Sequence, residues 1–161
     1  MSWYFIVLIV LAAFLFMEFM AWFTHKYVMH GFLWNLHKDH HIRDGRLFEW
    51  NDLFAVFFAA VSIIMLYFGV MAAYDFKFWI GVGIFLYGVA YFLFHDVYVH
   101  QRVKMFRNFS NRYLRATVKA HKEHHTPHTH ENYGFLIAPI KYYKEEFFAK
   151  TQNSKLKTQN P

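Results

Sequence analysis

The chain contains no cysteine, and this absence excludes several kinds of site at once. Without thiolates there can be no disulfide framework, no cysteine-held iron–sulfur cluster and no cysteine-based zinc site. With 3 Pro and 7 Gly among 161 residues, the sequence is not of low complexity either. A cysteine-free chain suits either redox state, so this feature does not indicate a compartment.

Acidic residues are few, but hydrophobic residues are abundant. The 11 Asp and Glu face 17 Lys and Arg, which gives a formal net charge of +6. Such a charge could suggest nucleic-acid binding, but the positions of the basic residues argue against it. However, 57% of the residues are hydrophobic and 23% are aromatic, including 21 Phe. The length predicts one domain, and the composition is not that of an ordinary soluble protein.

Three apolar stretches are long enough to cross a bilayer core of about 30 Å as helices. They are Trp3–Phe23, Leu53–Ala73 and Phe76–Phe94, with a tight turn expected at residues 73–75. Trp3–Phe23 is apolar except for Glu18, and it has neither a basic leader nor a small-residue cleavage site. We therefore interpret it as a retained span rather than a signal peptide. We expect this helix to continue to Gly31, a natural helix stop.

The basic residues orient the predicted spans. Four Lys and Arg lie between Thr24 and Asn51, twelve follow His95, and Lys77 alone lies at the other end of the spans. By the positive-inside rule, the N-terminus is outside, while the C-terminus and all 12 histidines are cytoplasmic. We thus predict an all-α integral membrane bundle of about three spans with short cytoplasmic helices. Residues 1–150 form its single domain, and residues 151–161 form a polar tail expected to be disordered.

Ten of the 12 histidines fall into two spacings, each used twice. His25 and His30, like His95 and His100, form an H-x4-H pair, and the two pairs are offset by 70 residues. Residues 37–41 and 121–125 each read H-x-x-H-H, which places three imidazoles on one face of a helix. Positions i and i+5 of a regular helix lie about 140° apart. An H-x4-H pair must therefore straddle its site, or the helix must deform there.

These histidines predict a metal site with two ions. Neutral imidazole is the commonest metal ligand, and ten imidazoles exceed what one ion accepts. Imidazole binds iron, copper, zinc and nickel, so the ligand type does not select the metal. We expect a His-rich di-metal site at the cytoplasmic membrane face, with these ligands: His25, His30, His37, His40, His41, His95, His100, His121, His124 and His125.

Carboxylates near the histidines are candidates for orienting the imidazoles. Glu18 lies seven residues before His25 on the same helical face, so it either supports the ligands or lies in a helix interface. Asp39, Asp96 and Glu123 adjoin ligands, but adjacent helical side chains point apart. For these three we favour ion pairs with Lys or Arg over contacts with imidazoles.

Other polar residues are expected in connecting roles. Asn51 or Asp52 is expected to cap the second span, and Ser110 or Asn111 to cap the helix of the last H-x-x-H-H motif. The basic, aromatic residues 102–109 suit a membrane interface or a solvated loop. Residues 133–140 are too short to span a bilayer, so they either dip into the membrane or cover the site.

The histidine motifs resemble those of the fatty acid hydroxylase/sterol desaturase superfamily of membrane di-iron enzymes. The resemblance is closer to bacterial β-carotene 3-hydroxylases, because the segment at residues 48–59 separates them from the wider superfamily. It covers most of residues 20–140. The resembling segments are HKYVMH (25–30), LHKDHH (36–41), FEWNDLFAVFFA (48–59), HDVYVHQR (95–102) and AHKEHH (120–125).

The resemblance implies hydroxylation at C3 of the β-ionone rings, which converts β-carotene through β-cryptoxanthin to zeaxanthin. It implies two iron ions (which zinc can replace in preparations), O2, and electrons from a ferredoxin/reductase chain. It assigns the ligand role to the same ten histidines and no catalytic residue beyond them. His128 and His130 lie outside the four motifs, as polar loop residues or as supports for the ligands. The substrate would be a carotenoid within the bilayer of the cytoplasmic (inner) membrane, and no nucleic acid is implied.

Three alternatives remain open from the residues. A di-iron enzyme of the same superfamily could hydroxylate or desaturate fatty acyl chains or sterols, and a ketolase would share both carotenoid and histidines. A non-catalytic membrane metal-binding protein, such as a transporter or sensor, belongs to another class. Its ligands would lie along the spans or in a tail, whereas these ten gather at one end. The sequence does not indicate an oligomeric state.

Overall fold

The structure is a computed structural model that describes residues 1–42, 46, 48–103, 105, 111–126 and 131–157. In these residues every regular element is helical and there is no strand. Three continuous helices are long and apolar enough to cross a membrane. They comprise Trp3–Phe32, Asp52–Met71 and Phe76–Val99. The predicted all-α membrane fold is confirmed.

Two of the three membrane helices change their winding at the histidine end. Helix α1 (Trp3–Phe23) continues as a π-helix over Thr24–Phe32, and α4 (Phe76–Tyr91) continues as a π-helix over Phe92–Val99. Helix α3 (Asp52–Met71) remains regular. Gly31, the expected stop, adopts a non-helical conformation (φ −100°, ψ −123°) and kinks the chain just before the element ends.

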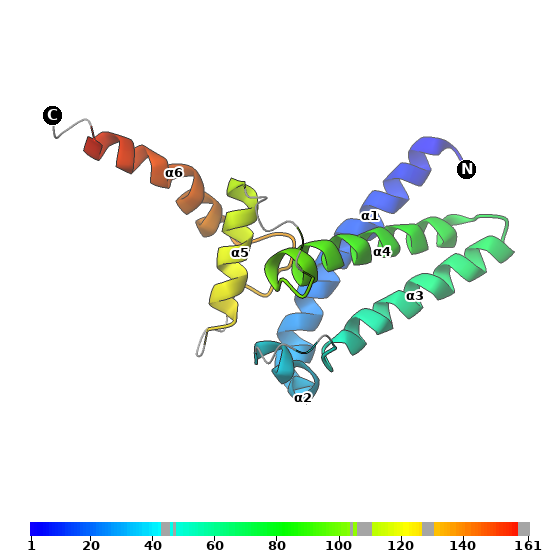
Figure 1. The fold of residues 1–161 in the computed structure, drawn as a ribbon. Helices are drawn as coiled ribbons and strands as arrows, with labels where there is room; N and C mark the ends of the chain where they lie inside the picture. Colours follow the sequence, from blue (N-terminus) through cyan, green and yellow to red (C-terminus); the bar gives the residue numbers. More distant parts are fainter. Residues whose placement is uncertain (43–45, 47, 104, 106–110, 127–130, 158–161) are drawn as a thin grey trace.

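Helix α4 packs against both α1 and α3 (Figure 1). The packing against α1 depends on a glycine, because a Cβ at Gly83 would lie 2.6 Å from the Cβ of Ala13. Between α3 and α4, Ala73 and Tyr74 form the expected turn with positive φ values of 53° and 61°. Asp75 then caps α4 by accepting a hydrogen bond from the backbone N–H of Lys77 at 3.0 Å.

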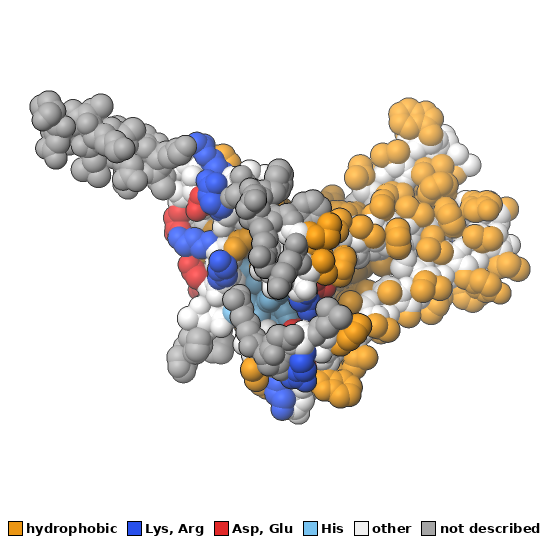
Figure 2. All heavy atoms as spheres, viewed as in Figure 1, with side chains coloured by type: hydrophobic (Ala, Val, Ile, Leu, Met, Phe, Trp, Pro, Cys, Tyr) orange, Lys and Arg blue, Asp and Glu red, His pale blue; other side chains and the backbone are white. Residues whose placement is uncertain are grey.

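Most apolar side chains on the spans point outward rather than into a core. Leu8, Phe16 and Ile63 are 61%, 59% and 64% exposed, and hydrophobic side chains cover this half of the molecule (Figure 2). Exposed apolar surface of this extent marks contact with lipid. Charged side chains and histidines gather in the other half.

The polar half is built from short helices and one helical pair. Helix α2 (Trp34–His37) passes into a 3-10 helix (Lys38–His41), so the first H-x-x-H-H motif spans two helical segments of different winding rather than one regular helix. Helix α5 (Arg112–His124) is capped by Asn111, one of the two predicted caps, through the N–H of Leu114 at 2.9 Å.

Helix α6 (Ile140–Lys157) packs on α5, and both lie at the end opposite the N-terminus (Figure 1). Tyr142 on α6 is buried against Ala116 and Ala120 on α5. Helix α6 extends into the segment that we expected to be a disordered tail, 151–161. The division of the chain at residue 150 stays a prediction.

Candidate metal centre

The H-x4-H pairs occur at the two π-helical segments, which explains their spacing. His25 and His30 lie within the first segment, His95 lies within the second, and His100 follows its last residue. A π-helix forms backbone hydrogen bonds between residues i and i+5, so these residues lie one above the other. The N–H of His100 donates to the carbonyl of His95 at 2.9 Å. The ring centroids of His25 and His30 are 5.0 Å apart, and those of His95 and His100 are 4.5 Å apart. Of the two alternatives, the deformed helix is therefore correct.

The structure gathers nine of the ten predicted ligands into two groups, each with nitrogen atoms within 4.8 Å of one another. The first histidine group consists of His25, His30, His37, His41 and His124. The second histidine group consists of His40, His95, His100 and His121.

His125 lies between the two groups and belongs to neither. Its ring centroid is 4.4 Å from that of His41 in the first group and 5.0 Å from that of His100 in the second. Its Nε2 lies 2.9 Å from the Nε2 of His121. His128 and His130 fall outside the described residues.

The nitrogen atoms in each group converge on a common centre. In the first group, the Nε2 atoms of His25 and His37 are 3.1 Å apart. In the second, the Nε2 atoms of His100 and His121 are 2.8 Å apart. The Nε2 atoms of His40 and His95 are buried and have no hydrogen-bond partner among the described residues. Buried polar atoms without a partner are costly, and a metal ion at the centre of the second group would satisfy both.

Burial keeps the imidazoles in the neutral form that binds metals. Burial lowers the pKa of His37 from 6.5 to about 3 and that of His41 to about 4. It also lowers the pKa of His125 to about 2, with neighbouring histidines adding to the effect. The pKa values of His40 and His121 lie well below 6.5 for the same reason. At neutral pH these side chains need not lose a proton before binding a metal.

Several imidazoles are oriented through Nδ1, which leaves Nε2 for a metal. The Nδ1 of His37 lies 2.7 Å from the Oδ1 of Asn51, and that of His40 lies 2.8 Å from the Oε2 of Glu49. Hydrogen bonds of this kind fix the tautomer and the orientation of a ligating histidine. Sequence reasoning missed these roles: the FEWND segment marked the resemblance, yet Asn51 was expected only as a cap.

Three further Nδ1 atoms also have acceptors. Two of them bond to backbone carbonyls: His25 to that of Tyr133 at 3.0 Å, and His124 to that of Glu131 at 2.9 Å. The Nδ1 of His95 lies 2.9 Å from the Oδ1 of Asp96. Asp96 therefore orients an imidazole, which was not expected of a neighbouring residue, and it also makes the expected ion pair, 3.6 Å from Arg102.

Arg102 connects the carboxylates behind the second group. Its guanidinium lies 3.1 Å from Glu49, 2.8 Å from Asp52 and 3.6 Å from Asp96. Two of these carboxylates orient His40 and His95, so one cation supports two candidate ligands. Arg102 is thus largely buried among carboxylates and does not face lipid headgroups. Most of the rest of the stretch predicted to suit a membrane interface or a loop, residues 103–109, lies outside the described residues.

The remaining acidic residues hold the backbone or other side chains. Neither predicted residue caps α3 with its side chain: Asn51 occupies the N-cap position without a side-chain cap hydrogen bond, and Asp52 accepts the N–H of Glu49 at 3.0 Å. Asp39 accepts the N–H of Trp50 at 2.7 Å, and Glu123 accepts the hydroxyl of Tyr142 at 2.5 Å.

The segment before α6 covers the histidines, as one of the two expectations for it proposed. The ring of Tyr133 lies 5.2 Å from that of His30 and 5.0 Å from that of His124. The ring of Phe135 stacks on His25, with centroids 4.8 Å and planes 23° apart. This segment therefore shields the first group from solvent.

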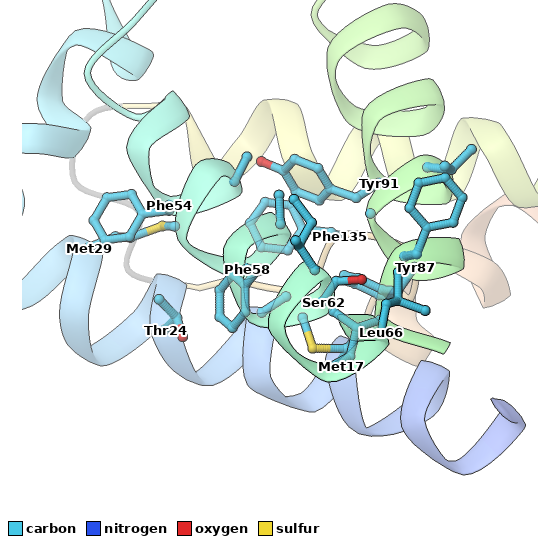
Figure 3. Close-up of a pocket in the computed structure, with 18 residues that line it drawn as sticks. Met17, Thr24, Met29, Phe54, Phe58, Ser62, Leu66, Tyr87, Tyr91 and Phe135 are labelled. Atoms are coloured by element: carbon cyan, nitrogen blue, oxygen red, sulfur yellow. The ribbon is translucent and has the colours of Figure 1, made fainter. Parts of the chain in front are cut away.

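An apolar cavity of about 460 Å³ lies between α1, α3 and α4 (Figure 3). Met17, Phe58 and Leu66 are among the side chains that line it. Tyr91 and Phe135 also line it, and the ring of Tyr91 stacks on His95 at 4.7 Å. The cavity thus ends against side chains that contact the candidate ligands, and its size and lining suit an apolar ligand.

Comparisons with known proteins agree with this arrangement. The model of the family described as fatty acid hydroxylase matches residues 10–142. The chain belongs to the fatty acid hydroxylase family.

This family member is similar to several bacterial proteins named β-carotene hydroxylase. That of Pantoea ananas is 42% identical over 143 residues, which cover 86% of this chain and 81% of the relative. That of Pseudescherichia vulneris is 41% identical over 81% and 76% of the two chains, respectively. That of Paracoccus sp. (strain PC1) is 39% identical over 82% of this chain and 83% of the relative. No solved structure matches the chain significantly.

Proposed function

We propose that the chain is a β-carotene hydroxylase, which inserts oxygen from O2 at C3 of the β-ionone rings. The observation that carries the chemistry is the convergence of nine histidines into two groups, each able to hold a metal ion. The relatives named β-carotene hydroxylase support the substrate. The products would be β-cryptoxanthin and then zeaxanthin.

The ten histidines would hold two iron ions. The first group would bind one iron and the second group the other, with His125 placed to serve either. Bound iron supplies the activation of O2 that attack on an unactivated C–H bond requires. Because imidazole also binds zinc, zinc can replace iron in preparations.

The protein's own residues prepare the site for this reaction. Asn51, Glu49 and Asp96 fix the tautomers of three ligands, so that Nε2 faces the centre in each. The apolar cavity accepts one ring end of the substrate from the bilayer and keeps water away from it. Tyr91 and Phe135 end the cavity at the histidines, so a ring placed there lies next to the metal site.

The distribution of charge supports a location and an orientation in the membrane. Sixteen of the 17 basic residues lie at the histidine end of the spans. The positive-inside rule then supports an inner-membrane protein with its N-terminus outside and its metal site and C-terminus in the cytoplasm. A cytoplasmic ferredoxin-type donor could deliver the electrons that the reaction consumes.

Expression in a bacterium that already makes β-carotene tests the proposal. The pigments are separated by chromatography and identified by mass spectrometry, in strains with the natural chain, with His121→Ala or with Lys122→Ala. Lys122 adjoins His121 but lies outside the ligand set, so its variant is the matched control. We expect products with one and two added oxygens from the natural chain and the control, and none from His121→Ala.

Other outcomes would redirect the assignment. Added oxygen with loss of two hydrogens per ring would identify a ketolase. Unchanged β-carotene, with the protein present and loaded with iron, would contradict the proposed substrate, and fatty acids and sterols would be tested next. Metal binding without oxygenation of any lipid would favour a non-catalytic metal-binding protein.

A further inference from the structure

Glu18 is the one acidic residue within the first membrane span, and its carboxylate binds a distant piece of backbone. Its Oε1 accepts hydrogen bonds from the N–H groups of Phe135 (3.3 Å), Leu136 (3.1 Å) and Ile137 (3.0 Å). Its Oε2 accepts the hydroxyl of Tyr87 at 2.8 Å. All four partners are donors, which suits a side chain that offers only acceptors.

The bound segment is non-helical and needs these contacts. Backbone N–H groups at the depth of a membrane require partners within the protein. The carbonyl of Leu136 accepts the hydroxyl of Tyr113, and the N–H of Ala138 donates to the hydroxyl of Tyr143 at 3.0 Å. Glu18 is thus the partner that ties residues 135–137 to the membrane spans, while the two tyrosines tie the same segment to α5 and α6.

Phe135 belongs to this segment and contacts both histidine groups as well as the cavity. Its ring stacks on His25 of the first group and lies 5.1 Å from the ring of His95 of the second. It also lies 4.9 Å from the ring of Tyr91 and lines the apolar cavity (Figure 3). Any shift of residues 135–137 would therefore move the surface against which a substrate ring rests beside the metals.

We propose that Glu18 is a positioning residue for the hydroxylation. By binding the three consecutive amides it fixes Phe135 at the end of the cavity, and Phe135 in turn determines which ring carbon faces the metals. This inference rests on the proposed function. It differs from a role in orienting a ligand, because the carboxylate acts through the backbone of residues 135–137 rather than through an imidazole.

Two substitutions of Glu18 separate positioning from other roles. Gln keeps a side-chain oxygen that can accept from the three amides, and its amide nitrogen can donate to the Tyr87 oxygen; Ala keeps neither. Pigments are analysed in β-carotene-producing cells, and the iron content of each purified protein is measured. Phe16→Ala, on the lipid-facing side of the same helix, is the matched control.

We expect Glu18→Gln and Phe16→Ala to make mainly the 3-hydroxy products. We expect Glu18→Ala to make about 10- to 100-fold less of them per iron, the scale expected when a reacting group is misplaced by about 1 Å. The remaining product should carry hydroxyl groups at the neighbouring carbons C2 and C4 as well as at C3. The iron content should match that of the natural chain.

Phe135→Ala provides an independent test that leaves the backbone contacts of Glu18 available. It should give the same mixture of C2, C3 and C4 products, and adding Glu18→Ala to it should change that mixture little. If Glu18→Ala does not accumulate, Phe135→Ala still tests the step on which the inference depends, that Phe135 determines which ring carbon is hydroxylated.

Four results would overturn the inference. These are the natural product pattern in Glu18→Ala, the natural pattern in Phe135→Ala, equal loss in Glu18→Gln and Glu18→Ala, or loss of iron from Glu18→Ala. Equal loss would assign the role to the charge of the carboxylate, and iron loss would assign Glu18 to the metal site itself. A natural chain that leaves β-carotene unchanged would instead contradict the proposed function.

Discussion

The backbone N–H of His100 donates to the carbonyl of His95, five residues earlier, and this π-type hydrogen bond brings together two candidate ligands that a regular helix would separate. The ring centroids of the pair are 4.5 Å apart. His25 and His30 lie in the other π-helical segment, at the end of the first span. Both segments begin where an apolar span reaches the polar half of the protein.

The division into two groups predicts the metal content of single variants. His30→Ala removes a ligand of the first group, and His95→Ala removes a ligand of the second. We expect each variant to retain about one iron per chain, because the other group is intact, and Lys122→Ala to retain two. Elemental analysis of purified protein checks this. Complete loss of iron from both variants would show that the two groups do not bind independently.

Asn51 should support metal retention through His37. Its Oδ1 accepts a hydrogen bond from the Nδ1–H of His37 at 2.7 Å. Loss of such a partner typically costs 10- to 100-fold in metal affinity or activity. We therefore expect Asn51→Ala to lose its iron at a chelator concentration about 10- to 100-fold lower than the natural chain does. Asn51→Asp keeps an acceptor oxygen and is the control. Equal retention of iron in the Ala variant and the natural chain would count against this role.

Arg102 should matter most for stability. Replacing it by Ala leaves Glu49, Asp52 and Asp96 without their shared cation. Removing one partner of a buried ion pair costs about 3–5 kcal/mol. We expect a lower unfolding temperature, with a larger deficit at pH 8 than at pH 5, because protonation of the abandoned carboxylates relieves their repulsion. A deficit that grows as the pH falls would contradict this explanation.

The metal-free protein should lose stability in acid. The folded-state pKa values of His37 (about 3) and His41 (about 4) lie below the unfolded value of 6.5. Between these values the unfolded chain binds more protons than the folded chain, so the free energy of unfolding falls as the pH falls. The decline should begin near pH 6.5 and continue to at least pH 3, because the pKa of His125 is lower still, about 2. Thermal unfolding in detergent at a series of pH values checks this, and a flat profile from pH 7.5 to 4 would refute it.

The sequence was sufficient to predict the three spans and that most of the clustered histidines lie together. Apolar runs of this length are typical of membrane spans, and the repeated spacings of histidines such as His25 and His95 predicted the two groups that could hold metal ions. The hydrogen-bond partners of these histidines could not be predicted from the sequence. Asn51 reaches His37 across 14 residues, and Glu18 reaches Phe135 across 117. Such contacts depend on how the helices pack, which local spacing does not encode. For the same reason, the sequence left undecided whether the helices deform at the H-x4-H pairs.

The central claim is that this histidine centre inserts oxygen from O2 into β-carotene. Cells that make β-carotene and this chain would be grown under 18O2 in ordinary water, and the hydroxycarotenoids would be examined by mass spectrometry. The account predicts that every new hydroxyl carries 18O and that His121→Ala yields no such product. Hydroxyl oxygen derived from water, or the same labelled products from the His121→Ala strain, would contradict it.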